Sequence, residues 1–266
     1  MLLQDMTWPE VRRLDVGEMV VILPTGSFEQ HGPHLPFTVD TDLVSAVAQG
    51  VERNLPTQIL LLPTLSVGMS THHNAFPGTL DIPQDTYMRM IRDLAASISR
   101  MHARKLFILN GHGGNDVPIR AAMREIKSEH PDLRTVFASY WQIASDPIKK
   151  IRTSEMGGLG HACELETSLM LHLHPNRVRM DLAKRDGPPY QDPLRKADMQ
   201  LPRPIYFVNE FHEISQSGVV GHPDLATPEK GQQFLTAIIQ SVTNFVQQFL
   251  TWEKELKSHV DVDEHR

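Results

Sequence analysis

Four side chains that can bind a metal ion lie close together near the start of the chain. Glu29, His31, His34 and Asp40 all fall in PTGSFEQHGPHLPFTVD, residues 24–40. The Pro and Gly residues of this segment exclude a helix and favour a stiff loop. Glu29 and His31 are two residues apart, so in an extended chain they point the same way. A carboxylate and an imidazole on one side of a loop suit Zn, Mn or Fe.

Asp40 ends this loop, just before a helix that the apolar spacing predicts over residues 41–55, with Thr41 or Asp42 as its N-cap. The two oxygens of a carboxylate can bridge two metal ions about 3.5–4 Å apart. Taken alone, Asp40 reads as a helix cap and His31 as a buried, hydrogen-bonded histidine, since both are common. Their joint occurrence with Glu29 favours a metal site.

His112 lies between glycines in NGHGGN, at the end of another buried strand. The segment has no GK[ST], and its glycine spacing does not match a dinucleotide fold, so a phosphate loop is not indicated. A plain tight turn is the simpler alternative. A histidine at the carboxyl end of a buried strand nevertheless favours a ligand.

His161, Glu164 and Glu166 begin a predicted helix in HACELETS. His161 and Glu164 are three residues apart, so they share a helical face if the helix begins early. Glu166 is five residues from His161, so both face one site only if the first turn is irregular. Acidic residues that interact favourably with the helix dipole are the alternative.

The remaining candidates are weaker. His72 and His73 in GMSTHHNAFPGT could line a pocket, and His222 lies in a loop that could pack on the site. The ordinary interpretation of Cys163 is a buried, inert thiol. His172 and His174 fit the C-terminal end of a helix.

Strands and helices alternate along the chain and must position these residues. Strands are predicted at 19–26, 57–68, 105–114, 134–141 and 205–211, and helices at 41–55, 83–103, 116–130, 161–175 and 228–257. Residues 142–160 are expected to form a long loop, and the Pro-rich residues 186–204 fit either an interface or a lid. The alternation is typical of a mostly parallel sheet covered by helices on both faces. The loops after the first three strands should meet at the ligand-binding edge of that sheet.

Composition excludes several classes of function. The net charge is −6 without a basic block, so nucleic acid is not an expected partner. No apolar run approaches the ~20 residues that cross a bilayer, and the N-terminus is not a secretory signal. The single cysteine, Cys163, excludes an intramolecular disulfide and favours the cytoplasm.

The sequence resembles the creatininase (creatinine amidohydrolase) family. Four motifs carry the resemblance in the family's order over roughly residues 20–175: GSFEQHGPHLP followed by VD, GMSTHHNAFPGT, NGHGGN and HACELETS. The resemblance implies a three-layer α/β/α sandwich with a mostly parallel central sheet, in a single domain over 1–266. It also implies a site for two divalent metal ions (Zn, Mn or Fe) and a homo-oligomer, with hexamers common in the family. The implied reaction is hydrolysis of a non-peptide C–N bond in a small cyclic or linear amide.

The family's site residues carry over by motif. Glu29 and His112 should hold one metal ion, His31 the other, and Asp40 should bridge them. In creatininase itself a Glu two positions after the histidine of NGH serves the second ion. That position is Gly114 here, so the ligand must come from elsewhere.

Glu166 is the expected substitute for this ligand and Glu164 the alternative. His161 should shuttle protons, and His34 matches no ligand role and should lie behind the ligands or in the pocket wall. The expected substrate-binding residues are Ser70, His73, Gly113 and Gly114.

The resemblance also bears on the substrate. Creatininase closes its pocket with tryptophans in the loop before the HA motif, but residues 142–160 contain none. This argues against creatinine itself and favours the broader branch, with its formamide hydrolases, mycofactocin-processing members and cyclitol hydrolases. A non-catalytic metal-binding member and a two-metal phosphoester hydrolase are the alternatives. The latter lacks a clustered phosphate clamp, since Arg152 is the nearest arginine to the motifs.

Overall fold

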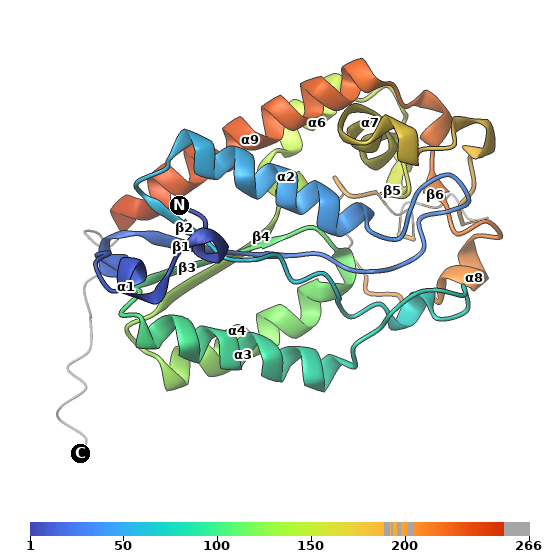
Figure 1. The fold of residues 1–266 in the computed structure, drawn as a ribbon. Coiled ribbons are helices and arrows are strands. Elements are labelled where there is room, and N and C mark those ends of the chain that lie inside the picture. Colours follow the sequence, from blue (N-terminus) through green and yellow to red (C-terminus); the bar gives the residue numbers. More distant parts are fainter. Residues whose placement is uncertain (189–191, 193, 196–197, 202–204, 253–266) are drawn as a thin grey trace.

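A four-stranded parallel sheet forms the centre of the structure, a computed structural model that describes residues 1–188, 192, 194–195, 198–201 and 205–252. The strand order is β2-β1-β3-β4 (Figure 1). The strands are β1 (Val20–Thr25), β2 (Ile59–Leu61), β3 (Lys105–Asn110) and β4 (Arg134–Ser139). Every pairing is parallel, so the carboxyl ends of the strands lie at one edge.

Helices cover both faces of this sheet, which confirms the expected three-layer α/β/α architecture. Val20 and Ile22 of β1 join one hydrophobic cluster, while Val21 and Leu23 join the other, as the two-residue period of a strand requires. The first cluster packs under α2 (Val39–Asn54), α5 (Tyr140–Ile143), α6 (Ser145–Ile151), α7 (Glu164–Leu173) and α9 (Pro228–Thr251). The second packs under α3 (Gln84–Arg100) and α4 (Asp116–Glu129), and α1 (Trp8–Val11) precedes β1.

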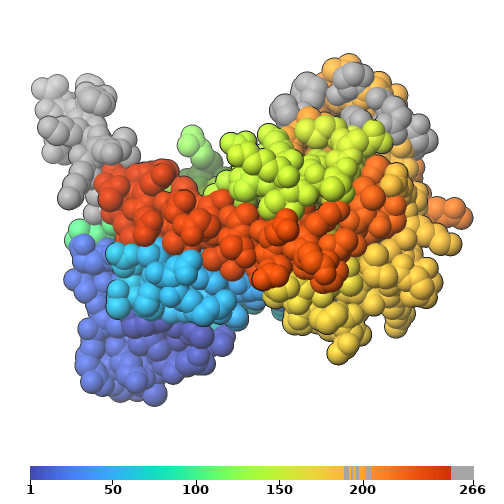
Figure 2. Space-filling model, turned by 90° about the horizontal axis from the view of Figure 1, so that it is seen from above, coloured from blue at the N-terminus to red at the C-terminus, as the bar shows by residue number. Residues whose placement is uncertain are grey.

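The long helix α9 lies across α2, α6 and α7 on the outer face (Figure 2). Phe234, Ile238, Val242, Val246 and Phe249 are fully buried at spacings of three and four residues, which places them on one helical stripe. Each such side chain contributes roughly 1.5–3 kcal/mol on burial. The predicted end of this helix, at 253–257, lies outside the described residues.

The predicted loop at 142–160 is wrong. It contains the second half of α5, all of α6, and the start of β5 (Leu159–His161). These elements are too short to give a clear periodic pattern, and they are stabilised by packing against α9 and by antiparallel pairing of β5 with β6 (Val220–Gly221). Part of the Pro-rich segment is anchored here, because the buried Asp198 carboxylate accepts hydrogen bonds from Arg152 and from the backbone of Gly157.

Other elements also differ from the sequence prediction. The second strand is only Ile59–Leu61, because Pro63 cannot continue the ladder. The predicted strand at 205–211 does not form: residues 205–208 lie exposed, and Phe211 begins the short helix α8 (Phe211–Ile214). The helix predicted from 161 begins at Glu164.

Hydrogen bonds tie the loops at the carboxyl edge to one another. Asn110, the last residue of β3, accepts from Thr25 Oγ1 (3.0 Å) and donates to the His112 carbonyl (2.6 Å) and to Ser139 Oγ (3.0 Å). The ends of β1, β3 and β4 are therefore locked together where the metal-capable loops begin. No helix in the described part of the chain combines the length and apolar character needed to span a membrane.

Candidate metal centre

Asp40 lies at the middle of a buried group of carboxylates and imidazoles. Its Oδ1 is 3.2 Å from His31 Nε2, and its Oδ2 is 3.0 Å from His112 Nδ1. Oδ2 also accepts a hydrogen bond of 2.7 Å from Ser27 Oγ. Helix α2 begins at Val39 with Thr38 as its N-cap, so Asp40 sits in the first turn and the predicted caps, Thr41 and Asp42, are wrong. Each carboxylate oxygen of Asp40 thus faces a different histidine.

On one side of Asp40 lie Glu29 and His112. His112 Nδ1 is 3.2 Å from Glu29 Oε1. His112 Nε2 is 3.0 Å from the Met69 carbonyl, which can only accept, so Nε2 carries a proton and Nδ1 is the ring nitrogen that faces the carboxylates. Ser70 Oγ donates to Glu29 Oε2 (2.7 Å) and fixes that carboxylate.

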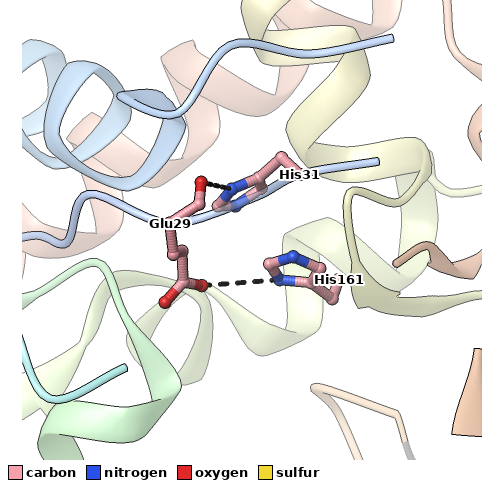
Figure 3. A group of neighbouring side chains, drawn as sticks. All are labelled: Glu29, His31 and His161. Carbon is pink, nitrogen blue, oxygen red and sulfur yellow. Dashed lines mark hydrogen bonds and ion pairs between the residues drawn. The ribbon is translucent and has the colours of Figure 1, made fainter. Parts of the chain in front are cut away.

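On the other side of Asp40 lie His31 and Glu166. His31 Nδ1 donates to the Glu29 carbonyl at 3.2 Å (Figure 3). His31 Nε2 is buried and faces Asp40 Oδ1 at 3.2 Å, and His31, Asp40 and Glu166 each place a ligand atom within 4.8 Å of the others. A backbone carbonyl that orients one ring nitrogen while the other stays free is the usual arrangement of a metal-binding histidine.

The two acids of α7 have different surroundings. Glu164 accepts from the backbone nitrogens of Thr153 (2.9 Å) and Ser154 (2.8 Å) and from Lys230 Nζ (2.7 Å), so both of its oxygens are engaged away from the centre. Glu166 faces His31 and Asp40, and accepts one long bond of 3.3 Å from the Cys163 backbone. The geometry therefore favours Glu166 over Glu164 as a ligand.

His161 reaches the centre from β5 and not from a helix, so the expected shared helical face with Glu164 is wrong. Its Nε2 is 2.7 Å from the Gln30 carbonyl, so Nε2 carries the proton. Its Nδ1 lies 3.7 Å from Glu29 Oε1 (Figure 3). Ala162, between His161 and the helix, has a positive φ of 51°. This irregular turn is what lets His161 and Glu166 face one site.

Charge is concentrated in this buried group. Burial, and then the Asp40 and Glu29 carboxylates, raise the pKa of Glu166 to about 7 despite the opposing effect of His31. Burial lowers the pKa of His31, but the carboxylates of Asp40, Glu166 and Glu29 outweigh it and raise that pKa to about 9. Three buried carboxylates beside imidazoles, which give up their protons when a metal ion binds, form a donor set that fits divalent cations such as Zn or Mn.

Three residues around the centre were missed or given little weight in the sequence. His72 forms a further group with Glu29 and His112, whose ligand atoms lie within 4.8 Å of one another. Gln30 donates from its side chain towards His73 Nδ1 (2.9 Å) and to the Gly218 carbonyl (3.1 Å). Phe211 stacks on His73 with ring centroids 3.9 Å apart. Gln30 could have been found, since it lies between Glu29 and His31, but nothing local marks Phe211.

The expected substrate-binding residues differ in their access to open space. Ser70 is fully buried against Glu29, and His73 Nε2 lies 3.2 Å from Glu29 Oε1. A Cβ at Gly113 would meet nothing within 4 Å. At Gly114 it would lie 2.2 Å from the Met69 carbonyl and 2.4 Å from His112 Nε2, so this backbone excludes any side chain there.

The other candidate residues lie away from the ligand atoms. His34 is buried with Nε2 2.9 Å from Thr167 Oγ1, behind His31, whose charge together with burial lowers the pKa of His34 to about 4. Cys163 is buried and acts as the N-cap residue of α7. The exposed His172 lies in the last turn of α7, and His174 is its C-cap residue.

Comparison with known proteins gives one consistent result. The family model Creatininase, described as creatinine amidohydrolase, matches residues 4–246. The chain is 30% identical to creatinine amidohydrolase of Pseudomonas putida over 259 residues, covering 92% of this chain and 95% of that protein. It is 28% identical to mycofactocin precursor peptide peptidase of Mycobacterium tuberculosis (86% and 85% covered) and to 3-dehydro-scyllo-inosose hydrolase of Thermotoga maritima (93% and 83% covered).

Solved structures agree with the sequence matches. A crystal structure of creatinine amidohydrolase superposes with a TM-score of 0.81 at 27% identity, covering 94% of this chain and 98% of that one. A manganese form of creatininase gives a TM-score of 0.79 at 27% identity, and a zinc-zinc form of a creatininase variant gives 0.81 at 26%, each with the same coverage.

Proposed function

The chain belongs to the creatininase family of metal-dependent hydrolases that act on carbon–nitrogen bonds, and we propose that it hydrolyses a small cyclic or linear amide with two divalent metal ions. Membership confirms the resemblance seen in the four motifs. One observation carries the two-ion proposal: the two oxygens of the Asp40 carboxylate face His31 and His112 from opposite sides.

Each proposed ion has its own set of residues. Glu29, His112 and Asp40 Oδ2 would hold the first ion, and His31, Glu166 and Asp40 Oδ1 the second. Support comes from the buried Nε2 of His31, which faces Asp40 Oδ1, and from the pKa of Glu166, which burial and the neighbouring carboxylates raise. When bound, such ions polarise a carbonyl oxygen and lower the pKa of water towards neutrality.

His161 has the geometry of a general base. Its Nε2 is committed to the Gln30 carbonyl, which leaves Nδ1 as the acceptor on the side of Glu29. Burial, and then the charges of His31 and His73, hold the pKa of His161 well below its usual range, so the imidazole is neutral at pH 7. Nδ1 accepts a proton from the attacking water as the water adds to the amide carbon, and donates it to the nitrogen as the C–N bond breaks.

The remaining proposals concern the molecule as a whole. We place the protein in the cytoplasm as a homo-oligomer of a single domain over 1–266. The single cysteine supports the cytoplasm. Light scattering of the purified protein measures the number of subunits.

Metal analysis together with a substrate panel tests the function. The purified protein should contain about two Zn, Mn or Fe ions per chain. It should hydrolyse at least one amide from a panel of creatinine, N-formyl amines, cyclic ureides and short peptides, and chelation should abolish this activity. A chain without metal, or one with metal but active on phosphoesters alone, would contradict the proposal.

The phosphoester alternative has little support in the geometry. Arg152 precedes the HACELETS motif in sequence, and its guanidinium is engaged by both oxygens of Asp198 at 3.0 Å. Its side chain is only 5% exposed. A guanidinium held in this way is not available to bind a phosphate.

A further inference from the structure

An aromatic ring covers the imidazoles of the centre. The ring of Phe211, in α8, lies 3.9 Å from that of His73 in a stacked arrangement, 4.7 Å from that of His161 edge-on, and 5.6 Å from that of His72 (centroid distances). Rings at these separations are in direct contact. No flat group can therefore enter between Phe211 and His73 while the ring keeps this position.

The other sides of the same histidines are closed by the protein. His161 Nε2 faces the Gln30 carbonyl and His112 Nε2 faces the Met69 carbonyl. The Gln30 side chain lies between His73 and Gly218. Glu29 and His73 are only 1% exposed, and His161 8%. The ring of Phe211 thus covers a side of these histidines that the backbone carbonyls and the metal-binding loops described above leave open.

The segment that carries Phe211 is firmly anchored on its C-terminal side. After α8, Ser215 Oγ (2.9 Å) and Ser217 Oγ (2.6 Å) both donate to Asp186 Oδ2, and Gly218 follows with a φ of +83°. Before α8, the side chains of Ile205 to Val208 are 44% to 77% exposed. Figure 1 shows α8 at the rim of the molecule, beside β6.

A helix of one turn has little stability of its own and depends on the contacts of its side chains. The contact between Phe211 and the imidazoles therefore ties α8 to the centre.

We propose that Phe211 is the gate and a specificity-determining residue of this site. The substrate reaches the centre when α8 turns about residues 215–218, and the Phe211 ring then packs on the bound substrate in place of His73. This arrangement favours amides that present a flat or apolar face to the ring. The inference rests on the proposed function for the identity of the substrate, but the position of the gate is a separate claim.

Removal of metal by a chelator measures access to the centre without knowledge of the substrate. The metal-loaded protein is mixed with an excess of 4-(2-pyridylazo)resorcinol and the absorbance of the metal complex is followed. Phe211→Ala should release metal at least about tenfold faster than the wild type, and Phe211→Tyr, which keeps the ring, should restore slow release.

Phe207→Ala is the matched control, because it removes the same ring from an exposed position in the same segment. Equal release rates for the wild type, Phe211→Ala and Phe207→Ala would overturn the gate. A melting curve for each variant separates faster access from loss of the fold.

A second measurement tests the gate even if the protein binds no metal. Diethyl pyrocarbonate modifies accessible imidazoles, and peptide mass spectrometry reports the modification of His72 and His73. Phe211→Ala should be modified several-fold faster at these two residues, and Phe207→Ala at the wild-type rate. If the protein binds no metal but Phe211→Ala is modified faster, the proposed function is refuted and the gate is supported. If the protein binds metal but modification and metal release are both unchanged, the gate is refuted and the proposed metal site is supported.

Discussion

The residues around the metal centre come from two regions that are built in different ways. Glu29, His31 and His112 follow parallel strands directly, and Asn110 locks the ends of those strands together. His161 ends β5 and Glu166 lies in the first turn of α7, and between them the chain turns through the positive φ of Ala162. The first region is positioned by the sheet, and the second by contacts with distant segments such as Lys230. Their difference predicts where a substitution removes metal and where it alters activity or stability alone.

The largest expected effect is at Asp40, the one side chain of the first region that faces both halves of the centre. Asp40→Asn keeps the shape of the side chain but removes the charge that His31 and His112 face. We expect the protein to lose most of its metal by elemental analysis, and kcat/KM to fall by about 10³-fold or more.

Asp42→Asn is the matched control for this substitution. Asp42 lies one half-turn further along α2 and pairs with Arg177 at the surface. Its loss should leave the metal content unchanged. Full metal content in Asp40→Asn would show that this carboxylate is not a bridging ligand.

His161, in the second region, should matter for turnover and not for metal. His161→Ala removes the acceptor Nδ1 while leaving Glu29, His31 and Asp40 in place, so we expect kcat to fall by about 10²-fold with metal retained. Elemental analysis and steady-state kinetics on the same sample measure both. His172→Ala, at an exposed position of α7, serves as the control. Loss of one ion in His161→Ala would make His161 a ligand instead.

The two regions also differ in how far the sequence could predict them. A strand, a Gly-rich turn and a histidine are adjacent in sequence, so the parallel sheet and the positions of His31 and His112 followed from local patterns. β5 is three residues long and pairs with a strand about 60 residues away. No local pattern could place His161 on it, or Phe211 above the imidazoles. The choice between Glu164 and Glu166 depended on Lys230 and Ser154, which only the folded chain brings to Glu164.

These two acids therefore give a direct test within the second region. Glu164→Gln leaves Lys230 Nζ without its charged partner, and we expect it to lower the free energy of unfolding by about 3 kcal/mol with metal content unchanged. Glu166→Gln should instead lower the metal content and change the free energy of unfolding little. The raised pKa of Glu166 means that its ionised form is disfavoured in the metal-free protein, so neutralising it should cost little stability while one ion is lost. Urea unfolding of the metal-free protein and elemental analysis measure the two effects, and the reverse pattern would identify Glu164 as the ligand.

Acid should act on the second region through Glu164. Burial raises the pKa of this acid, but Lys230 and the hydrogen bonds of Ser154 and Thr153 outweigh it and lower the pKa from 4.5 to about 2. A lowered folded-state pKa adds stability above pH 4.5, and this is lost as the pH falls from 4.5 through about 2. The loss for the wild type should be about 3 kcal/mol. Unfolding curves over this range should be flatter for Glu164→Gln, and parallel curves would contradict the assignment.

The smallest expected effect concerns the turn at Ala162. Its φ of 51° and the φ of 62° at His102 are the two positive values at non-glycine residues in the described chain. His102 follows the C-cap of α3 in an exposed position, far in sequence from the centre, whereas Ala162 is buried between His161 and α7. Glycine relieves the backbone strain at either position but adds entropy to the unfolded chain, so each substitution should change the free energy of unfolding by about 1 kcal/mol or less.

Activity should separate these two turns. Ala162→Gly loosens the link that holds His161 relative to Glu166, so we expect turnover to fall several-fold with metal retained, while His102→Gly keeps wild-type turnover. Unfolding curves and kinetics on both variants test this. If Ala162→Gly keeps full turnover, the second region must be held in place by its contacts with Gln30 and Lys230 alone, and the strained turn would be a consequence of that packing and not its cause.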